Sequence, residues 1–283
     1  MNREQRAALA QQTIEILESG HYVAPSGRRV EIDADQRLAV NDSRLYRPAD
    51  FPPMDRGISR HVPAADPKVE VTSETTLEAA YRLVSSGDED PCCLNFASAK
   101  NPGGGFLSGS QAQEESLARS SGLYACLVRH MEMYEFNRGL HTSLYSDHMI
   151  YSPHVPAFRN DRGQLLEYPY KLSFISAPAV NAGAIKRNEP ETVPLIGPTM
   201  ETRLEKVLWV AARHGHRTLI LGAWGCGVFG NDPAEVGELF ARALGAGGKF
   251  QGCFERVVYA IYDRTPKQEV LSSFRKALAN AGV

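Results

Sequence analysis

The chain has 283 residues, of which 43% are hydrophobic and 23% charged, the ordinary balance of a soluble globular protein. With 31 basic and 33 acidic side chains its formal net charge is -2, which argues against a nucleic-acid coat or a membrane-surface binder, because both usually carry a basic excess. A phosphate-bearing ligand stays possible, since backbone N–H groups and helix N-termini bind anions without side-chain charge.

Residues 3–18 predict a helix that ends near Gly20. An irregular, proline-containing region follows to about Pro67 and includes one short strand at residues 30–32. The first residues lack the apolar stretch of a secretory signal, and no apolar run approaches the roughly 20 residues that span a bilayer. The five cysteines form neither a CxxC pair nor an even disulfide framework. We therefore expect a reduced, soluble protein of the cytoplasm.

From residue 76 on, the hydrophobic pattern is regular. Apolar residues at helical spacing alternate with short apolar runs that are typical of buried strands. The expected helices are 76–85, 117–131, 200–211, 234–244 and 270–281, and the expected strands are 92–97, 148–152, 172–177, 218–223 and 257–262. This alternation predicts a largely parallel sheet with helices on both faces. We expect a core of residues 71–283 that forms a single structural unit, with residues 1–70 as a helical and irregular extension packed on it.

The most informative segment joins the strand at 92–97 to the helix that follows. It contains Gly103-Gly104-Gly105 and, after seven residues, Gln113-Glu114-Glu115. Three glycines in a row let the backbone approach a ligand closely and adopt positive φ angles. Taken separately, the glycines could be an ordinary turn, and the glutamates could be acids that favour a helix N-terminus. Their combination at this short separation is much less expected by chance.

This pattern resembles the signature of poly(ADP-ribose) glycohydrolases, in which a triple glycine is followed after a short spacer by Gln-Glu-Glu. The segments at 151–159 and 174–181 look like parts of the bacterial-type branch of that family. With the loop near Gly225, the resemblance covers most of the chain after about residue 70 and, more weakly, the part before it. It implies a macrodomain-like α/β fold, a three-layer α/β/α sandwich with a mixed, largely parallel sheet.

A second glycine loop, residues 225–230, lies between an expected strand and an expected helix. Its spacing matches GxGxxG, the fingerprint of dinucleotide-binding folds. However, Asp263, the acid at the end of the next strand, follows Gly230 by 33 residues rather than about 20. Macrodomains, by resemblance, carry a diphosphate-binding loop at this place, in which Phe229 would stack on a ribose. The simpler role for Phe229 is that of a core anchor.

Hydrolysis of the bond between two ADP-ribose units needs a proton for the leaving oxygen, stabilisation of an oxocarbenium-like centre and a water nucleophile. Glu114 and Glu115 are neighbours on a helix and so fit poorly with the usual pair of separated carboxylates. The resemblance instead implies that Glu115 acts first as acid and then as base. It implies that Glu114, the second catalytic residue, holds the ribose hydroxyls.

The resemblance also implies which residues bind the substrate. The two glycine loops would hold the diphosphate, and Asn101 could bind the terminal ribose. The implied set is Asn101, Gly103, Gly104, Gly105, Gln113, Gly225, Cys226, Gly227, Val228, Phe229, Gly230 and Asn231. The scheme needs no cofactor and no metal, and His141, His148 and His154 are spaced too loosely for a metal motif. As a thiol, Cys226 fits a small packing residue better than a nucleophile.

The resemblance therefore implies an enzyme, a poly(ADP-ribose) glycohydrolase that releases ADP-ribose. Its expected partners are poly(ADP-ribose) and ADP-ribosylated proteins, without direct binding to nucleic acid or membranes. Three alternatives stay open. A non-catalytic ADP-ribose-binding macrodomain would have no need of the Gln-Glu-Glu triplet, and a hydrolase of mono-ADP-ribosylated targets would keep the same fold. An NAD-dependent oxidoreductase would rest on the GxGxxG match alone.

Overall fold

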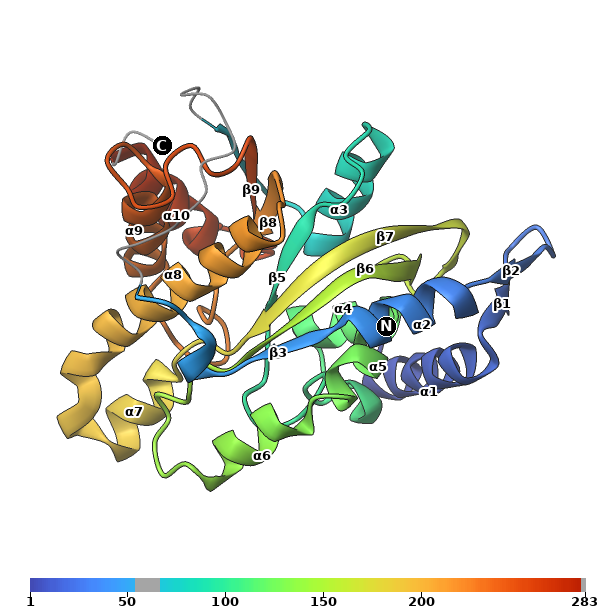
Figure 1. The fold of residues 1–283 in the computed structure, drawn as a ribbon, viewed down its shortest axis with the longest axis horizontal. Coiled ribbons are helices and arrows are strands. Elements are labelled where there is room, and N and C mark those ends of the chain that lie inside the picture. The colour runs from blue at the N-terminus through green and yellow to red at the C-terminus, as the bar shows by residue number, and fades with distance from the viewer. Residues whose placement is uncertain (54–66, 281–283) are drawn as a thin grey trace.

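A seven-stranded sheet forms the centre of the computed structural model, which describes residues 1–53 and 67–280 (Figure 1). The strand order is β3-β6-β7-β5-β8-β9-β4. The strands are β3 (Arg44–Tyr46), β4 (Lys68–Thr72), β5 (Cys92–Phe96), β6 (Met149–Arg159), β7 (Leu165–Ala177), β8 (Thr218–Leu221) and β9 (Arg256–Ala260). From β7 to β4 all neighbours are parallel, whereas β3, β6 and β7 pair antiparallel.

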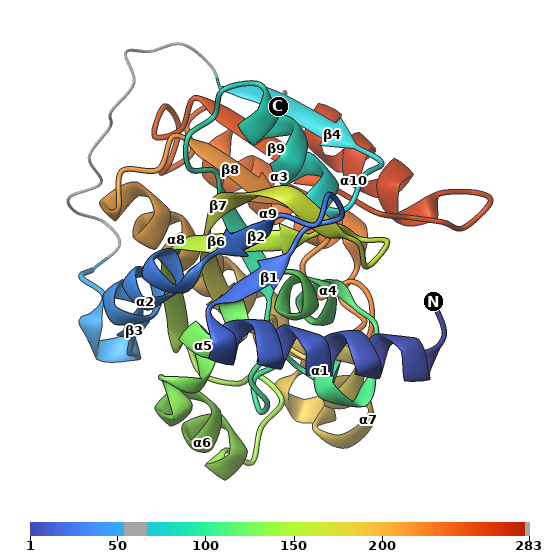
Figure 2. The same cartoon turned by 90° about the vertical axis from the view of Figure 1, so that its right-hand side faces the viewer.

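Helices cover both faces of this sheet (Figures 1 and 2). One layer contains α8 (Ile196–Arg213), α9 (Pro233–Leu244) and α10 (Glu269–Asn280), and the other contains α3 (Thr76–Ser85), α4 (Gln113–Ser120) and α5 (Leu123–Val128). The remaining helices are α1 (Arg3–Ser19), α2 (Asp33–Asp42), α6 (Met131–Gly139) and α7 (Ala182–Asn188). No helix among the described residues is long and apolar enough to cross a membrane. The predicted three-layer sandwich with a mixed, largely parallel sheet is confirmed.

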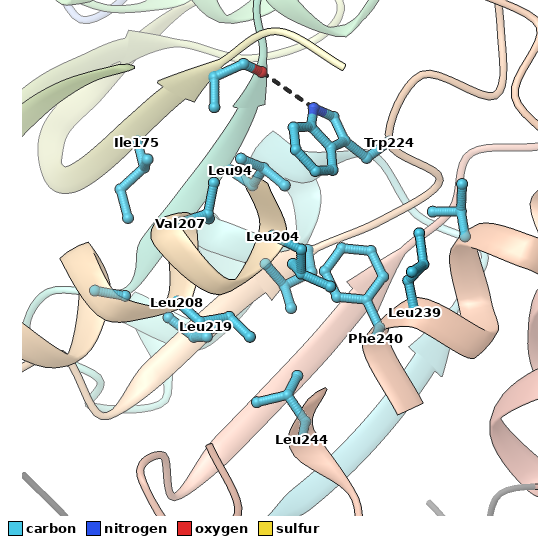
Figure 3. Close-up of a cluster of buried hydrophobic side chains, with 14 of the residues drawn as sticks. Leu94, Ile175, Leu204, Val207, Leu208, Leu219, Trp224, Leu239, Phe240 and Leu244 are labelled. Carbon is cyan, nitrogen blue, oxygen red and sulfur yellow. Dashed lines mark hydrogen bonds between the residues drawn. The ribbon is translucent and has the colours of Figure 1, made fainter. Parts of the chain in front are cut away.

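The pleat of the strands explains the two hydrophobic cores. Successive side chains of a strand point to opposite faces of the sheet. Leu94 accordingly belongs to the core under α8 and α9, whereas its neighbour Cys93 belongs to the core under α3 and α5. Figure 3 shows the first core, in which Leu94 lies near Leu204 of α8 and Phe240 of α9. Continuous apolar strands are what a sheet buried on both faces requires.

The segment before residue 70 is tied to the sheet and to the second helical layer. Strand β3 pairs with β6 at one edge, and the predicted boundary at residue 70 falls within β4 at the other edge. A separate small sheet pairs β1 (His21–Val23) with β2 (Arg29–Glu31). Helix α1 packs against α4, as Figure 2 shows. Residues 54–66, part of the expected irregular region, lie outside the described residues.

Helix α1 has the ends that its sequence predicts. Asn2 caps its start in a capping box with Gln5, and Gly20 ends it in the left-handed conformation with φ of 73°. The prediction of a helix over residues 3–18 is therefore confirmed. The last helix is also confirmed as α10, although Ala281, at the end of the expected range, lies outside the described residues.

The prediction of one continuous helix over residues 117–131 is wrong. The chain forms the end of α4 and all of α5 there, and α6 begins only at Met131. Helix α4 ends at Ser120 because Ser121 is extended, with φ of -149°. Ser121 bridges to Ala157 of β6, and the N–H of Gly122 donates to the carbonyl of Pro156 at 3.0 Å. Pairing with a strand that is distant in sequence thus overrides the local helical pattern.

Candidate active site

The two glycine loops meet at the carboxyl ends of the central parallel strands. The first loop follows β5 and the second follows β8, and these two strands are neighbours in the sheet. Ligands of α/β folds bind outside this edge of the sheet. A cavity of about 950 Å³ opens there, and residues of both loops line it.

The first loop brings the backbone of Gly104 against both glutamates. Gly103 and Gly104 have φ angles of 68° and 60°, a region that favours glycine. A Cβ atom on Gly104 would lie 2.5 Å from Oε1 of Glu115 and 3.2 Å from Oε2 of Glu114. The carboxyl groups of these neighbouring residues therefore approach the same point of the loop.

Gln113 fixes the start of α4 to the sheet. Its Oε1 accepts the N–H of Phe96 at 2.8 Å, and its Nε2 donates to the carbonyl of Leu94 at 2.8 Å and to Oγ1 of Thr76 at 3.1 Å. The side chain lines the cavity, but its amide is committed to these protein partners. In the structure Gln113, predicted to bind substrate, holds the two glutamates in place.

Glu114 is buried, with 3% of its surface exposed. Its Oε2 accepts the N–H of Ser98 at 2.7 Å, and its Oε1 accepts the side-chain amide of Asn95 at 3.3 Å. Burial raises the pKa of Glu114 from its ordinary value of 4.5 to about 8, although these two hydrogen bonds oppose the shift. In the free protein this carboxyl therefore keeps its proton at neutral pH.

This raised pKa predicts a pH dependence of stability. Because the folded chain holds the proton of Glu114 more tightly than the unfolded chain, the stabilisation is fully present below pH 4.5 and is lost as the pH rises through about 8. We expect the free energy of unfolding to fall across this window, and the Glu114→Gln variant, which cannot ionise, to lack that part of the fall. Urea unfolding of both proteins at several pH values checks this. Equal slopes against pH would contradict it.

Glu115, in contrast, is half-buried and lines the cavity. Its Oε1 accepts the N–H of Gly105 at 3.0 Å. Asn101, at the other end of the glycine run, is exposed and also lines the cavity, while its backbone N–H donates to Oγ of Ser98 at 3.1 Å. Glu115 is therefore the glutamate of the pair that a ligand can reach more freely.

The second loop is anchored on both sides. Trp224, just before Gly225, is buried, and its indole N–H donates to the carbonyl of Ala177 at 3.0 Å (Figure 3). Asn231 is also buried, and its amide donates to the carbonyls of Val180 at 2.8 Å and of Gly225 at 3.1 Å. Both ends of the second loop are therefore fixed to the rest of the protein.

Most, but not all, of the predicted substrate-binding residues line the cavity. The lining includes Asn101, Gly104, Gly105, Gln113, Gly225, Cys226, Gly227, Val228 and Phe229, together with Glu114 and Glu115. Among the described residues, Gly103, Gly230 and Asn231 are not part of it. Gly103 and Gly230 have positive φ angles, of 68° and 67°, and Asn231 braces the second loop.

Two side chains of the second loop have features that bear on their roles. The backbone carbonyl of Phe229 accepts the N–H of Gly183 at 2.8 Å. The centroid of the Phe229 ring lies 6.0 Å from the centroid of the Tyr145 ring. Burial raises the pKa of the Cys226 thiol to about 12, so this cysteine stays protonated at neutral pH and is a poor nucleophile.

Sequence reasoning missed the wall that follows β9. Residues 260–264 line the cavity, and Tyr262 is 48% exposed, with the guanidinium of Arg264 4.6 Å from its ring centroid. The position of this segment could have indicated it, because the carboxyl end of β9 lies at the same edge of the sheet as the two glycine loops. Asp263, the acid weighed above against the dinucleotide fingerprint, accepts hydrogen bonds from Thr265 and from the N–H of Val270 at the start of α10. These bonds, the Thr265 hydroxyl first, hold its pKa below the ordinary value.

The three histidines considered as metal ligands do not line the cavity. Nδ1 of His148 lies 2.8 Å from Oγ of Ser146, and Nδ1 of His154 lies 3.4 Å from Asp90. In the part of the chain that the structure describes, no group of three or more His, Cys, Asp or Glu side chains could hold a metal ion.

Comparison with known proteins identifies relatives of this site and fold. A family model described as the catalytic domain of microbial-type PARG matches residues 10–160. The chain is 51% identical to poly(ADP-ribose) glycohydrolase (PARG) from Thermomonospora curvata, with a TM-score of 0.92, covering 97% of this chain and 100% of that one. A structure of that glycohydrolase bound to the inhibitor ADP-HPD matches at 51% identity and a TM-score of 0.90, covering 97% and 99% of the two chains.

A more distant relative is poly(ADP-ribose) glycohydrolase from Deinococcus radiodurans in complex with ADP-ribose. It is 45% identical, with a TM-score of 0.82, and the match covers 89% of this chain and 99% of that chain. The search of curated proteins found no match. The fold of this chain is therefore the macrodomain-like fold of these glycohydrolases.

Proposed function

Because the chain belongs to the microbial-type poly(ADP-ribose) glycohydrolase family, we propose that its cavity hydrolyses the ribose–ribose O-glycosidic bonds of poly(ADP-ribose) and releases ADP-ribose. The observation that carries this proposal is the meeting of Glu114 and Glu115 at Gly104, inside a cavity that both glycine loops line. The relatives bound to ADP-ribose and to ADP-HPD support this class of ligand. The substrates are poly(ADP-ribose) chains and the proteins that carry them.

The glycine loops bind the diphosphate of the terminal ADP-ribose unit. Backbone N–H groups of Gly225 and of residues 227–229 are the donors, because a glycine backbone lets a phosphate approach closely. At Gly227 there is open space for a phosphate beside the backbone, because an added Cβ would meet no atom within 4 Å. The distal ribose then lies beside Gly104, where the two carboxyl groups converge.

Glu114 holds the ribose hydroxyls. With a pKa of about 8, its carboxyl is protonated at neutral pH and can both donate a hydrogen bond and accept one. A protonated, buried carboxyl is a poor general base and a poor nucleophile. Because Glu114 is enclosed by Asn95 and Ser98 while Glu115 is the more open to the cavity, we assign the proton transfers to Glu115.

Glu115 supplies both proton transfers of the reaction. As the bond from the anomeric carbon to the adjoining ribose breaks, the leaving ribose oxygen takes the proton of Glu115. A water molecule then attacks the oxocarbenium-like carbon and gives a proton to the Glu115 carboxylate, which restores the acid. Between the two steps the N–H of Gly105, 3.0 Å from Oε1, stabilises the carboxylate.

Release of free ADP-ribose tests this proposal. The protein is incubated, with a metal chelator present, with poly(ADP-ribosyl)ated protein and separately with mono-ADP-ribosylated protein, and ADP-ribose is measured by chromatography. We expect release from the polymer, with the first unit left on the protein. ADP-ribose binding without release would indicate a binding module instead. Equal release from both substrates would indicate that the protein–ribose linkage is also cleaved.

A further inference from the structure

Arg119 lies one helical turn after Glu115 on α4, so the two side chains share one side of the helix. Only 3% of its surface is exposed, and among the described residues it forms no ion pair with a carboxylate. Burial lowers the pKa of its guanidinium to about 10. A buried cation without an ion-pair partner is costly, and so its position calls for a reason.

The guanidinium of Arg119 fastens the loop between the glycines and α4. Nη1 donates to the carbonyl of Ser110 at 2.7 Å, and Nη2 donates to Oε1 of Gln111. The N–H of Ser110 in turn donates to the carbonyl of Gly105 at 3.1 Å, and the N–H of Gly105 donates to Glu115 at 3.0 Å. Hydrogen bonds thus tie Arg119 to Ser110, Ser110 to Gly105, and Gly105 to the carboxylate of Glu115.

The hydrogen bonds from Arg119 to Ser110 and Gln111 form a clamp on the loop, and the loop has little room to move without breaking them. A Cβ on Gly105 would lie 2.5 Å from Oγ of Ser110, so the two ends of the loop are in close contact. The backbone of Arg119 is held as well. Its carbonyl accepts Oγ1 of Thr13 in α1 at 2.6 Å and Nε of Arg159 in β6 at 3.2 Å. Helix α1, which lies beside α4 in Figure 2, therefore supports the clamp from outside.

We propose that Arg119 is a positioning residue for the reaction, which holds the Gly105 N–H against Glu115 and keeps a positive charge beside that carboxylate. This inference rests on the proposed function. The charged groups whose fields reach Arg119 are Glu115, Arg6 of α1 and Asp161 of the β6–β7 turn, and Arg159 also lies close to it. When Glu115 has given its proton away, this positive charge and the Gly105 N–H stabilise the carboxylate that remains.

Replacement of Arg119 tests the inference by separating kcat from KM. For Arg119→Gln we expect kcat on poly(ADP-ribose) to fall by roughly 30-fold, because a charge-assisted hydrogen bond and a nearby charge are lost. KM and the Kd for ADP-ribose should change by less than about 3-fold, since Arg119 does not line the cavity. Arg119→Lys keeps the charge and one donor, and it should recover part of kcat.

Arg256→Gln is the control. It removes a partly buried arginine at the start of β9, whose ion pairs go to Asp88 and Glu70 rather than to the glycine loop. It should lower Tm and leave kcat near that of the wild type, since Arg256 does not line the cavity. A kcat of Arg119→Gln within about 2-fold of the wild type, or an equal loss in Arg256→Gln, would overturn the inference.

Amide hydrogen exchange at Gly105 gives a second readout that needs no activity. The wild-type Gly105 N–H should be protected by its bond to Glu115, and Arg119→Gln should lose this protection while the central strands keep theirs. If the wild type did not cleave the polymer, the proposed function would fail, yet the exchange result would still decide whether Arg119 positions Gly105. Unchanged protection in the variant would overturn the positioning role.

Discussion

Replacing Glu115 by glutamine is expected to lower kcat on poly(ADP-ribose) by roughly 1000-fold. An amide can neither give a proton to the leaving ribose oxygen nor accept one from water, whereas its oxygen can still accept the N–H of Gly105. The variant should therefore fold like the wild type and bind ADP-ribose with a Kd within a few-fold of it. Single-turnover cleavage and calorimetric titration with ADP-ribose measure the two quantities separately.

Two further variants make this result specific. Glu114→Gln keeps a hydrogen-bonding group at the buried position and should lose much less activity than Glu115→Gln, because the wild-type carboxyl there is already protonated at neutral pH. Glu135→Gln changes an exposed acid on α6 that does not line the cavity and should behave like the wild type. If Glu114→Gln were the more damaged enzyme, the roles of the two glutamates would be reversed.

Gly104→Ala is expected to reduce kcat by at least about 100-fold, although it changes no ionisable group. The new Cβ would lie 2.5 Å from Oε1 of Glu115 and 3.0 Å from its Cδ, so the carboxyl must leave its present place. The φ angle of 60° adds a backbone cost of about 1–2 kcal/mol for a residue with a Cβ. Rate measurements on poly(ADP-ribose) and the Tm of the variant report these two effects.

Gly27→Ala separates backbone strain from the displaced carboxyl. Gly27 has a φ angle of 85°, but a Cβ there would meet no atom within 4 Å. This variant should be destabilised by a similar amount and keep full activity. Wild-type kcat in Gly104→Ala would show that the placement of Glu115 beside this glycine is not needed for the reaction.

Helix ends and helical spacing, which depend on neighbouring residues, could be predicted from the sequence. The start and end of α1 depend on Asn2 and Gly20, and the apolar period of residues 200–211 lies within α8. The break between α4 and α5 was not predictable in this way. The apolar spacing continues through Ser121, where the pairing of that residue with Ala157 interrupts the helix. The contact that decides the structure is 36 residues distant in the sequence.

The same distinction applies to the site. The spacing of the triple glycine and of Gln113-Glu114-Glu115 placed the glutamates beside a glycine loop, and the structure brings them together there. The different surroundings of the two glutamates were not readable from the spacing. Glu114 is enclosed by Asn95 and Ser98, which belong to β5 and to the turn after it. The wall at Tyr262 and the clamp at Arg119 likewise depend on how distant segments pack.

A structure of the Glu115→Gln chain with a short poly(ADP-ribose) chain bound would test the central claim most directly. The account predicts that the diphosphate of the terminal unit lies against the backbone of residues 225–229. It also predicts that the glycosidic oxygen lies within about 3.2 Å of the side chain at position 115. A glycosidic oxygen beyond hydrogen-bond reach of that side chain, or a diphosphate bound away from both glycine loops, would contradict the account.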